Sequence, residues 1–215
     1  MHALPAEVVL AQVRAVLADI RVDAVKVGML GTVEVTLAVA EAIDELPEGV
    51  PVVVDPVMVS ESGGRLLDDE AQAALVAEIL PRTTVLTPNL LEARVLVGEE
   101  IDGEALVRRV LELGPRVVVL TGGHREVASD LFLAADGDGR VVSIEGERHP
   151  DGAAHGSGCT HSSVLAAQLA LGRRPLQAAQ IARALAGAAV GRGLRDVGHG
   201  PGPVDVLDLG SMRAN

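Results

Sequence analysis

Aromatic side chains are almost absent from this sequence. Phe132 is its only aromatic residue, and the 215 residues include no tryptophan or tyrosine. The core must therefore be built from valine, leucine, isoleucine and alanine, and a bound ring must lie against aliphatic walls. Proteins that bind single-stranded nucleic acids usually stack the bases on aromatic side chains, so this composition argues against that class.

Cysteine and long apolar runs are equally scarce. Cys159 is the single cysteine, so the chain cannot form an internal disulfide. The sequence has no run of 18 apolar residues, and its start lacks the charged and apolar regions of a signal peptide. These absences predict a cytoplasmic protein that does not bind membranes.

Positive charge is in short supply. Thirty acidic residues stand against 18 basic ones, which gives a formal charge of −12. An acidic surface repels the phosphate backbone of nucleic acids, so no nucleic-acid partner is expected. A small phosphate-bearing ligand would have to be held by local devices, namely helix N-termini, a metal ion, or one or two basic side chains.

The chain length and the order of its patterns predict one α/β domain over residues 1–215. Apolar runs typical of strands alternate with segments of helical periodicity, which favours a mainly parallel sheet with helices on both faces. Strands are expected at 24–27, 51–54, 84–86, 117–120, 128–135 and 141–146. Helices are expected at 6–19, 32–45, 68–80, 90–97, 104–113 and 175–191, with a further helix after residue 156.

The last two strands should form a hairpin, because Asp136-Gly137-Asp138-Gly139 between them is a strong turn signal. The other strands should run parallel. Ligands of parallel sheets bind at the carboxyl ends of the strands, and polar residues do follow the expected strands there. Asp55, Asn89 and Thr121 are the clearest examples.

The most informative stretch is the glycine-rich turn His155-Gly156-Ser157-Gly158-Cys159, which is followed by an apolar run at helical spacing. A glycine turn that opens a helix directs free N–H groups toward one point at the positive end of the helix dipole, which attracts an anion. A thiol at such a position has a lowered pKa and favours the thiolate. Two alternatives stay open: Cys159 as a small buried hydrophobic residue, or a nucleophilic cysteine with His155 or His161 as its partner.

Six ordered blocks resemble the hydroxymethylpyrimidine/phosphomethylpyrimidine kinases of the ribokinase-like superfamily. They are VDAVKVGML (22–30), VPVVVDPVM (50–58), LTPNLLEA (86–93), VVVLTGGH (117–124), AHGSGCTHSS (154–163) and GHGP (198–201). The resemblance implies a ribokinase-like fold. It also implies transfer of the ATP γ-phosphoryl group to hydroxymethylpyrimidine and then to its monophosphate, in thiamine biosynthesis. A related pyridoxal kinase, or a nucleotide-binding protein without chemistry, is the alternative.

The resemblance also implies catalytic roles in the glycine-rich turn. Gly156, Ser157 and Gly158 would offer N–H groups to the transferring phosphoryl group, which is the electrostatic stabilisation that such chemistry needs. Cys159 would be the base that takes the proton of the substrate hydroxymethyl group.

The cofactors implied are ATP and Mg²⁺. Asp55 and Asn89 would lie at the ATP phosphates, and Asp55 and Glu92 would hold Mg²⁺, which prefers oxygen ligands and keeps several waters. Each of these residues has a structural alternative: Asp55 can simply end a strand, and Asn89 with Glu92 can form a capping box at the start of a helix.

Other positions complete the implied site. Thr121, Gly123 and the tail near His199 would lie on the nucleotide side, and Met29 and Val57 would form part of the pyrimidine pocket. The alternative for Met29 is a core-filling role. Lys26, in the same block as Met29, can be explained as a side chain that extends from a strand end to solvent.

The sequence departs from the family pattern in three places. Only 21 residues precede Val22, so we expect the first strands of the family to be missing. Three explanations are open: the gene start is placed too late, the protein is a shortened kinase, or it is a non-catalytic remnant. An unpaired sheet edge would then favour a homo-oligomer. Thr121 stands where many relatives have lysine, and His161 where they often have an apolar residue.

Overall fold

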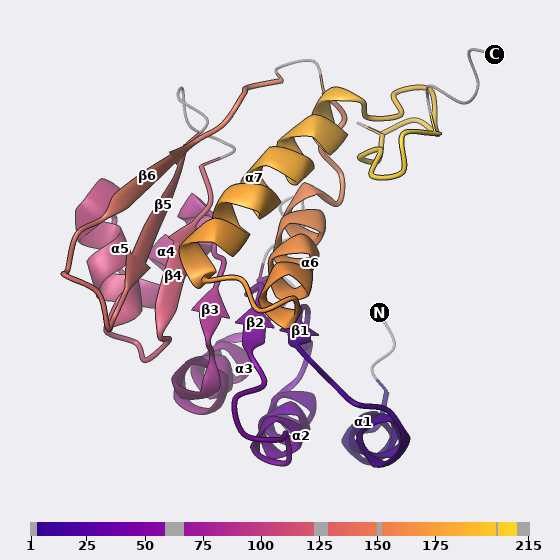
Figure 1. Ribbon diagram of the computed structural model, residues 1–215. Coiled ribbons are helices and arrows are strands. Elements are labelled where there is room, and N and C mark those ends of the chain that lie inside the picture. Colours follow the sequence, from indigo (N-terminus) through magenta and orange to yellow (C-terminus); the bar gives the residue numbers. More distant parts are fainter. Residues whose placement is uncertain (1–3, 59–66, 123–128, 150–151, 201, 210–215) are drawn as a thin grey trace.

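The computed structural model describes residues 4–58, 67–122, 129–149, 152–200 and 202–209. A six-stranded sheet lies between two layers of helices (Figure 1). The strands are β1 (Val25–Val27), β2 (Val52–Val54), β3 (Val85–Leu86), β4 (Val117–Leu120), β5 (Ser129–Ala134) and β6 (Val142–Glu145). Neighbours from β1 to β4 are parallel, whereas β5 is antiparallel to both β4 and β6. The mainly parallel α/β sheet predicted from the sequence, with its terminal hairpin, is confirmed.

The helices also lie where the sequence predicts them. They are α1 (Ala6–Asp19), α2 (Val33–Asp44), α3 (Asp69–Ala74), α4 (Leu90–Val97), α5 (Gly103–Leu111), α6 (Ser157–Ala170) and α7 (Pro175–Gly191). The helix expected at 68–80 is not uniform, because α3 passes into a π turn at Leu75–Ile79 and a 3₁₀ turn at Leu80–Arg82. Pro81 lies in the 3₁₀ turn, and its ring and missing N–H prevent a regular α-helix there.

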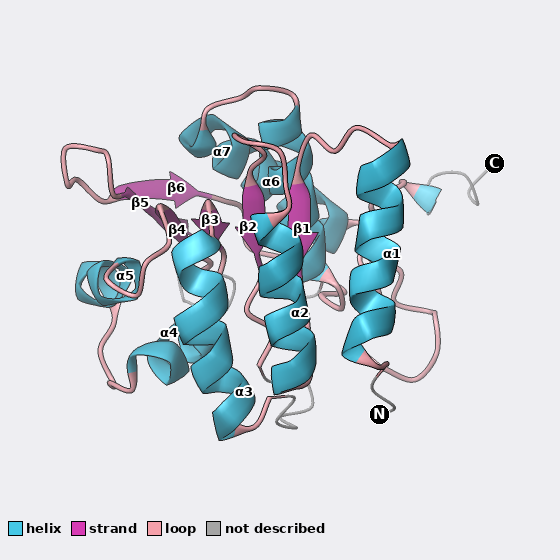
Figure 2. Cartoon of the chain, turned by 90° about the horizontal axis from the view of Figure 1, so that it is seen from below, coloured by secondary structure: helices cyan, strands magenta, loops and turns pink. Residues whose placement is uncertain are grey.

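Successive residues of a strand point to opposite layers, so each buried strand serves two cores. Val52 and Val54 of β2 pack into the core beneath α2–α5, whereas Val53 packs into the core beneath α6 and α7. Figure 2 shows α2 and α3 of one layer in front of the sheet and α6 of the other layer behind it. The continuous apolar run of β2 therefore follows from burial on both faces.

The core beneath α6 and α7 compensates for the scarcity of aromatic residues with small side chains. Phe132 lies there, and Ala178, Ala179 and Ala182 of α7 have no exposed surface. Alanine lets a helix approach its neighbours closely, so a dense interior can form without large rings.

Helix α1 lies beyond β1 and packs on α2 (Figure 1). Leu10 is its one buried residue, and Arg14 donates a hydrogen bond to Glu41 of α2 at 2.6 Å. Val16 on the same helix is 46% exposed. This exposure follows because α1 packs on a neighbouring helix along a narrow stripe, which holds Leu10 with Ala38 and Ala42 of α2.

Among the described residues, no helix combines the length and the apolar character needed to cross a membrane.

Candidate active site

Four of the residues singled out in the sequence lie just after the carboxyl ends of the four parallel strands. Met29 follows β1, Asp55 follows β2, Asn89 follows β3 and Thr121 follows β4. Asn89 and Thr121 form an isolated parallel bridge, and the Thr121 N–H donates to Pro88 O at 2.9 Å. The edge at which a parallel sheet usually binds ligands is thus formed by the residues that the sequence singled out.

The glycine-rich turn directs unpaired backbone groups toward this edge. Gly156 precedes α6 with φ 84°, a left-handed conformation that favours glycine. None of the described residues accepts a hydrogen bond from the N–H of Gly158 or of Cys159. The Ser157 N–H differs from the expectation, because it donates to Ala154 O at 3.0 Å. The Gly156 N–H has no acceptor among the described residues either, so the unpaired N–H groups of the turn are those of Gly156, Gly158 and Cys159.

The tail of the chain supports this turn, a contact that sequence reasoning missed. Val204 N–H donates to His155 O at 3.0 Å, and His155 N–H donates to Gly202 O at 3.3 Å. His199 lies in the exposed loop before this segment. No local pattern could have revealed the contact, because it joins segments on either side of α7.

The carboxylate of Asp55 is the point where three elements meet. Its Oδ2 accepts a hydrogen bond from Ser162 Oγ of α6 at 3.1 Å and lies 3.6 Å from Lys26 Nζ of β1. A Cβ placed on Gly158 would lie 4.0 Å from the same oxygen. Asp55 is 6% exposed, so it is a buried anchor for the turn as well as the residue that ends β2.

Glu92 combines a structural contact with an unusual titration. The Asn89 N–H donates to Glu92 Oε2, and the Glu92 N–H donates to Asn89 Oδ1, both at 2.9 Å, which confirms the capping box. Burial raises the pKa of Glu92 to about 7; the Asp55 charge also raises it, and N–H donors of Asn89 and Met58 oppose the shift. A carboxyl group that titrates near neutrality at a ligand-binding edge is typical of a functional site.

The chemistry of Asp55 and Glu92 fits a magnesium ion. The described part of the chain has no group of three or more histidine, cysteine, aspartate or glutamate side chains that could hold a metal ion. Mg²⁺ needs only one or two carboxylates because it keeps several waters. Asp55 raises the pKa of Glu92 through its charge, so the two carboxylates repel each other, and a divalent cation between them would relieve this repulsion.

The structure decides between the alternative roles of some of the remaining site residues. Cys159 is exposed on α6, so it is not a small buried hydrophobic residue. Met29 is 48% exposed and therefore does not fill the core. Val57 is half-buried beside Asp55, whose carbonyl oxygen accepts its N–H at 2.8 Å. Gly123 lies outside the described residues.

His161 does not serve as the partner of Cys159. It is 4% exposed, and its Nε2 lies 3.4 Å from Asp130 Oδ2 on β5. The ring thus faces the interior between α6 and the sheet, whereas Cys159 lies on the exposed side of the same helix. This arrangement leaves His155 as the histidine nearest in sequence for a cysteine–histidine pair.

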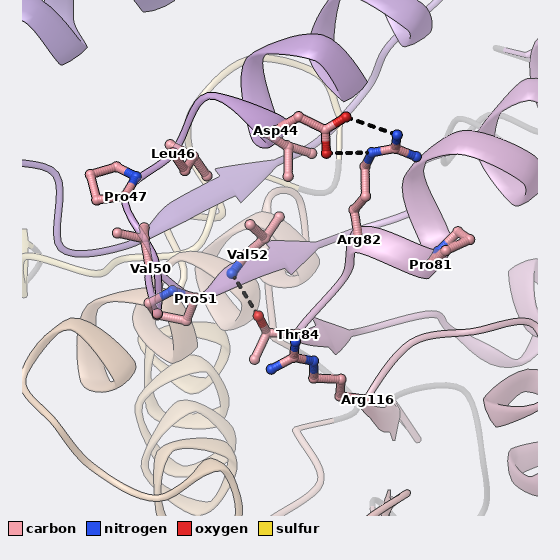
Figure 3. A pocket seen from close by; sticks show the side chains of 12 residues that line it. Asp44, Leu46, Pro47, Val50, Pro51, Val52, Pro81, Arg82, Thr84 and Arg116 are labelled. Atoms are coloured by element: carbon pink, nitrogen blue, oxygen red, sulfur yellow. Dashed lines mark hydrogen bonds and ion pairs between the residues drawn. The ribbon is translucent and has the colours of Figure 1, made fainter.

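A hollow of about 270 Å³ lies at the opposite end of the strands, where β2 and β3 begin (Figure 3). Arg82 on its wall donates two hydrogen bonds to Asp44, at 2.9 and 2.8 Å, and Thr84 Oγ1 accepts the N–H of Val52 at 2.9 Å. These groups bind one another across the rim. The hollow is therefore separate from the polar residues described above, which lie at the carboxyl ends of the strands.

Comparisons with known proteins agree with this geometry. A family model described as phosphomethylpyrimidine kinase matches residues 1–205. The chain is 41% identical over 211 residues to the hydroxymethylpyrimidine/phosphomethylpyrimidine kinase of Rhizobium meliloti, covering 93% of this chain and 76% of that protein. Phosphomethylpyrimidine kinase from Clostridium difficile 630 aligns with TM-score 0.71 and 30% identity, over 85% of this chain and 75% of that one. Pyridoxal kinase from Staphylococcus aureus, in complex with AMP-PCP and pyridoxal, aligns with TM-score 0.83 and 28% identity, over 94% and 74%.

Proposed function

The chain belongs to the phosphomethylpyrimidine kinase family, with its ribokinase-like fold, and we propose that it phosphorylates hydroxymethylpyrimidine and then its monophosphate with ATP. One observation carries the proposal. The unpaired N–H groups of Gly158 and Cys159 and the exposed thiol lie at the start of α6, where a Cβ on Gly158 would be 4.0 Å from Asp55 Oδ2. We further propose that the chain acts as a single domain in the cytoplasm, as the sequence predicts.

The turn would act on the phosphoryl group as it moves. The thiolate of Cys159 takes the proton of the substrate hydroxyl group, whose oxygen forms a bond to the γ-phosphorus as the bond to the ADP oxygen breaks. ADP leaves with that electron pair. The free N–H groups of Gly158 and Cys159 stabilise the negative charge on the phosphoryl oxygens, aided by the N-terminal end of the α6 dipole. Gly156 permits this backbone geometry, and Ser157 continues the turn into the helix.

The nucleotide would enter from the β3 and β4 side. Asp55 and Glu92 would hold Mg²⁺, which when bound neutralises charge on the ATP phosphates. Asn89 and Thr121, joined by their bridge, would line the nucleotide side together with Gly123 and His199. In this proposal the pyrimidine would lie on the side of β1 and β2.

Met29 and Val57 are our candidates for the pyrimidine contacts. Met29 follows β1 with 48% of its surface exposed, and Val57 is half-buried next to Asp55. Exposed apolar area beside a polar site is available for an aliphatic wall against a ring, the mode of binding that a chain without stacking aromatics requires.

Turnover with purified protein tests the proposal. ATP, Mg²⁺ and hydroxymethylpyrimidine should yield ADP together with the mono- and then the diphosphate, both visible by mass spectrometry. ADP formation that does not depend on the pyrimidine would contradict it, since it would indicate hydrolysis of ATP without transfer.

A pyridoxal kinase is the second candidate, supported by the similarity to the Staphylococcus aureus structure. Competition separates the two. A pyrimidine kinase should phosphorylate hydroxymethylpyrimidine in the presence of equal pyridoxal, whereas a pyridoxal kinase should prefer pyridoxal by a wide margin.

A nucleotide-binding protein without chemistry is the third candidate. It predicts that ATP with Mg²⁺ raises the melting temperature by mass action while neither acceptor gains phosphate. The same assay, run beside a thermal-shift measurement, therefore distinguishes all three candidates.

We also propose that the chain forms a homo-oligomer through the edge at β1. Among the described residues β1 pairs only with β2, and apolar side chains stay exposed nearby on α1 and α2. These side chains belong to Val8 and Val16 of α1, to Ile20 directly after α1 and to Leu37 of α2, and they are between 42% and 59% exposed. Light scattering after size exclusion should show an oligomer, and Val8→Glu should shift it toward the monomer; a monomeric wild-type protein would refute this.

A further inference from the structure

Lys26 is the only lysine in the 215-residue sequence; every other residue among the 18 lysines and arginines is an arginine. This single lysine lies on β1, at the end of the sheet that carries the candidate site, with its Nζ 3.6 Å from Asp55 Oδ2. Its side chain is only 22% exposed. A basic side chain that only extended to solvent would be more exposed. An arginine, which the chain has at its other basic positions, would serve equally well in that role.

The side chain of Lys26 lies close to Gly28, which carries no side chain of its own. A Cβ on Gly28 would lie 2.8 Å from Lys26 Nζ, closer than real side-chain carbons approach other atoms. The side chain therefore passes directly over Gly28 on its way to Asp55. An ammonium is a compact point charge, whereas a guanidinium is a broad planar group, so the space beside Gly28 suits the compact head of a lysine.

The ammonium and the glycine-rich turn share one neighbour. Asp55 Oδ2 lies near both Lys26 Nζ and the position where Gly158 would carry a Cβ, and the Gly158 N–H has no acceptor among the described residues. Asp55 and Glu92 on their own would repel a phosphate. Lys26 is the cation that the structure pairs with Asp55, so it offsets that repulsion on the side of the turn.

We propose that Lys26 is a further functional residue of the site, whose ammonium binds an oxygen of the transferred phosphoryl group beside Gly158. The inference rests on the proposed phosphoryl transfer. Lys26 keeps its proton and forms no covalent bond: the phosphoryl group passes from the ADP oxygen to the acceptor oxygen, and the acceptor proton goes to Cys159. The ammonium contributes charge where negative charge accumulates.

The single lysine makes a direct measurement possible. Protein grown with lysine labelled with ¹³C at Cε should give one side-chain signal by NMR. AMP-PCP with Mg²⁺, which carries a γ-phosphoryl group, should shift this signal saturably, and ADP with Mg²⁺ should shift it much less. Equal shifts with both nucleotides, or no shift at AMP-PCP concentrations that raise the melting temperature, would overturn the proposal.

Two variants test the role in turnover. Lys26→Met removes the charge at similar length, and Gly28→Ala keeps the lysine but requires its ammonium to shift, because a Cβ at residue 28 would lie 2.8 Å from Nζ. Both should lower kcat, the first by about 100-fold, and both should weaken binding of AMP-PCP relative to ADP. Gly187→Ala is the matched control, because a Cβ there meets nothing within 4 Å.

The outcomes separate this inference from the proposed function. Full turnover by a folded Lys26→Met protein refutes the role of Lys26 and leaves the kinase assignment intact. If no acceptor is phosphorylated by the wild type, the nucleotide-dependent shift of the lysine signal still decides whether the ammonium contacts a γ-phosphoryl group. If the role of Lys26 is purely structural, its substitution should change the melting temperature without changing the ratio of AMP-PCP affinity to ADP affinity. Gly28→Ala allows the same ratio to be measured if Lys26→Met fails to fold.

Discussion

Ser162 Oγ donates a hydrogen bond to Asp55 Oδ2 at 3.1 Å, a contact between residues 107 positions apart. Both side chains are buried. Since Asp55 ends β2 and Ser162 lies one turn beyond the glycine-rich turn, this contact fixes the distance between the sheet edge and the start of α6. The geometry proposed for phosphoryl transfer depends on that distance.

Ser162→Ala should therefore weaken both the fold and the reaction. Loss of a buried hydrogen bond to a carboxylate costs on the order of 2 kcal/mol of unfolding free energy. A displaced α6 should lower kcat by roughly 10- to 100-fold. Chemical denaturation and the coupled ADP assay measure the two effects. Ser163→Ala, at an exposed neighbour on the same helix, should change neither, and a Ser162 variant with normal turnover would contradict the positioning role.

Cys159→Ser tests the proposed base. A serine hydroxyl is a far weaker base than a thiolate, so kcat should fall by roughly 100- to 10,000-fold. The melting temperature should stay the same, because Cys159 is exposed. Comparable turnover in variant and wild type would show that another group takes the proton.

Glu92 should make the stability of the protein depend on pH. Its pKa is raised in the folded state to about 7 from an ordinary value of 4.5, so between these values the folded state holds a proton that the unfolded state has lost. Stability contributed by this group is therefore full below pH 4.5 and is lost as the pH rises to about 7, by on the order of 3 kcal/mol. Urea denaturation from pH 4.5 to 8 measures the trend.

Glu92→Gln isolates that contribution, since glutamine does not titrate but can still accept the Asn89 N–H in the capping box. The variant should match the wild type near pH 4.5 and exceed it in stability at pH 8. Added Mg²⁺ should reduce the difference in unfolding free energy between variant and wild type at pH 8, because it should stabilise only the wild type. If the difference in unfolding free energy between the two proteins does not change with pH, Glu92 is not the titrating group.

Asp130 should be more important for stability than its partner His161. Its Oδ1 accepts the buried Gly122 N–H at 2.9 Å and lies 3.9 Å from Arg183 Nη1, and its Oδ2 faces His161 Nε2. Asp130→Asn removes the charge that balances a buried guanidinium, which should cost about 3 kcal/mol.

His161→Leu should change stability by less than about 1.5 kcal/mol, because neither ring nitrogen has a hydrogen-bond partner among the described residues. Urea denaturation of both variants measures which substitution lowers the unfolding free energy more. A larger loss in His161→Leu than in Asp130→Asn would show that the ring, not the carboxylate, organises this cluster.

Local patterns were enough to predict the secondary structure. Helix α4 (Leu90–Val97) and helix α7 (Pro175–Gly191) have the bounds expected from the sequence, and Thr32 caps α2 through its side chain at the start of the helix expected at 32–45. Such features depend on residues three or four positions apart, which the sequence displays directly. The parallel order of the strands likewise allowed Asp55, Asn89 and Thr121 to be placed at one edge.

The sequence by itself thus determined the elements, the aliphatic composition of the core and the edge of the sheet where the site lies. Only the tertiary structure decided that Lys26 and Ser162 meet at one oxygen of Asp55, that His161 turns inward to Asp130, and that the tail at 202–204 supports the glycine-rich turn. The physical reason is distance along the chain. Contacts between residues far apart in sequence depend on strand register and on how helices pack against the sheet, and no short stretch of sequence encodes either.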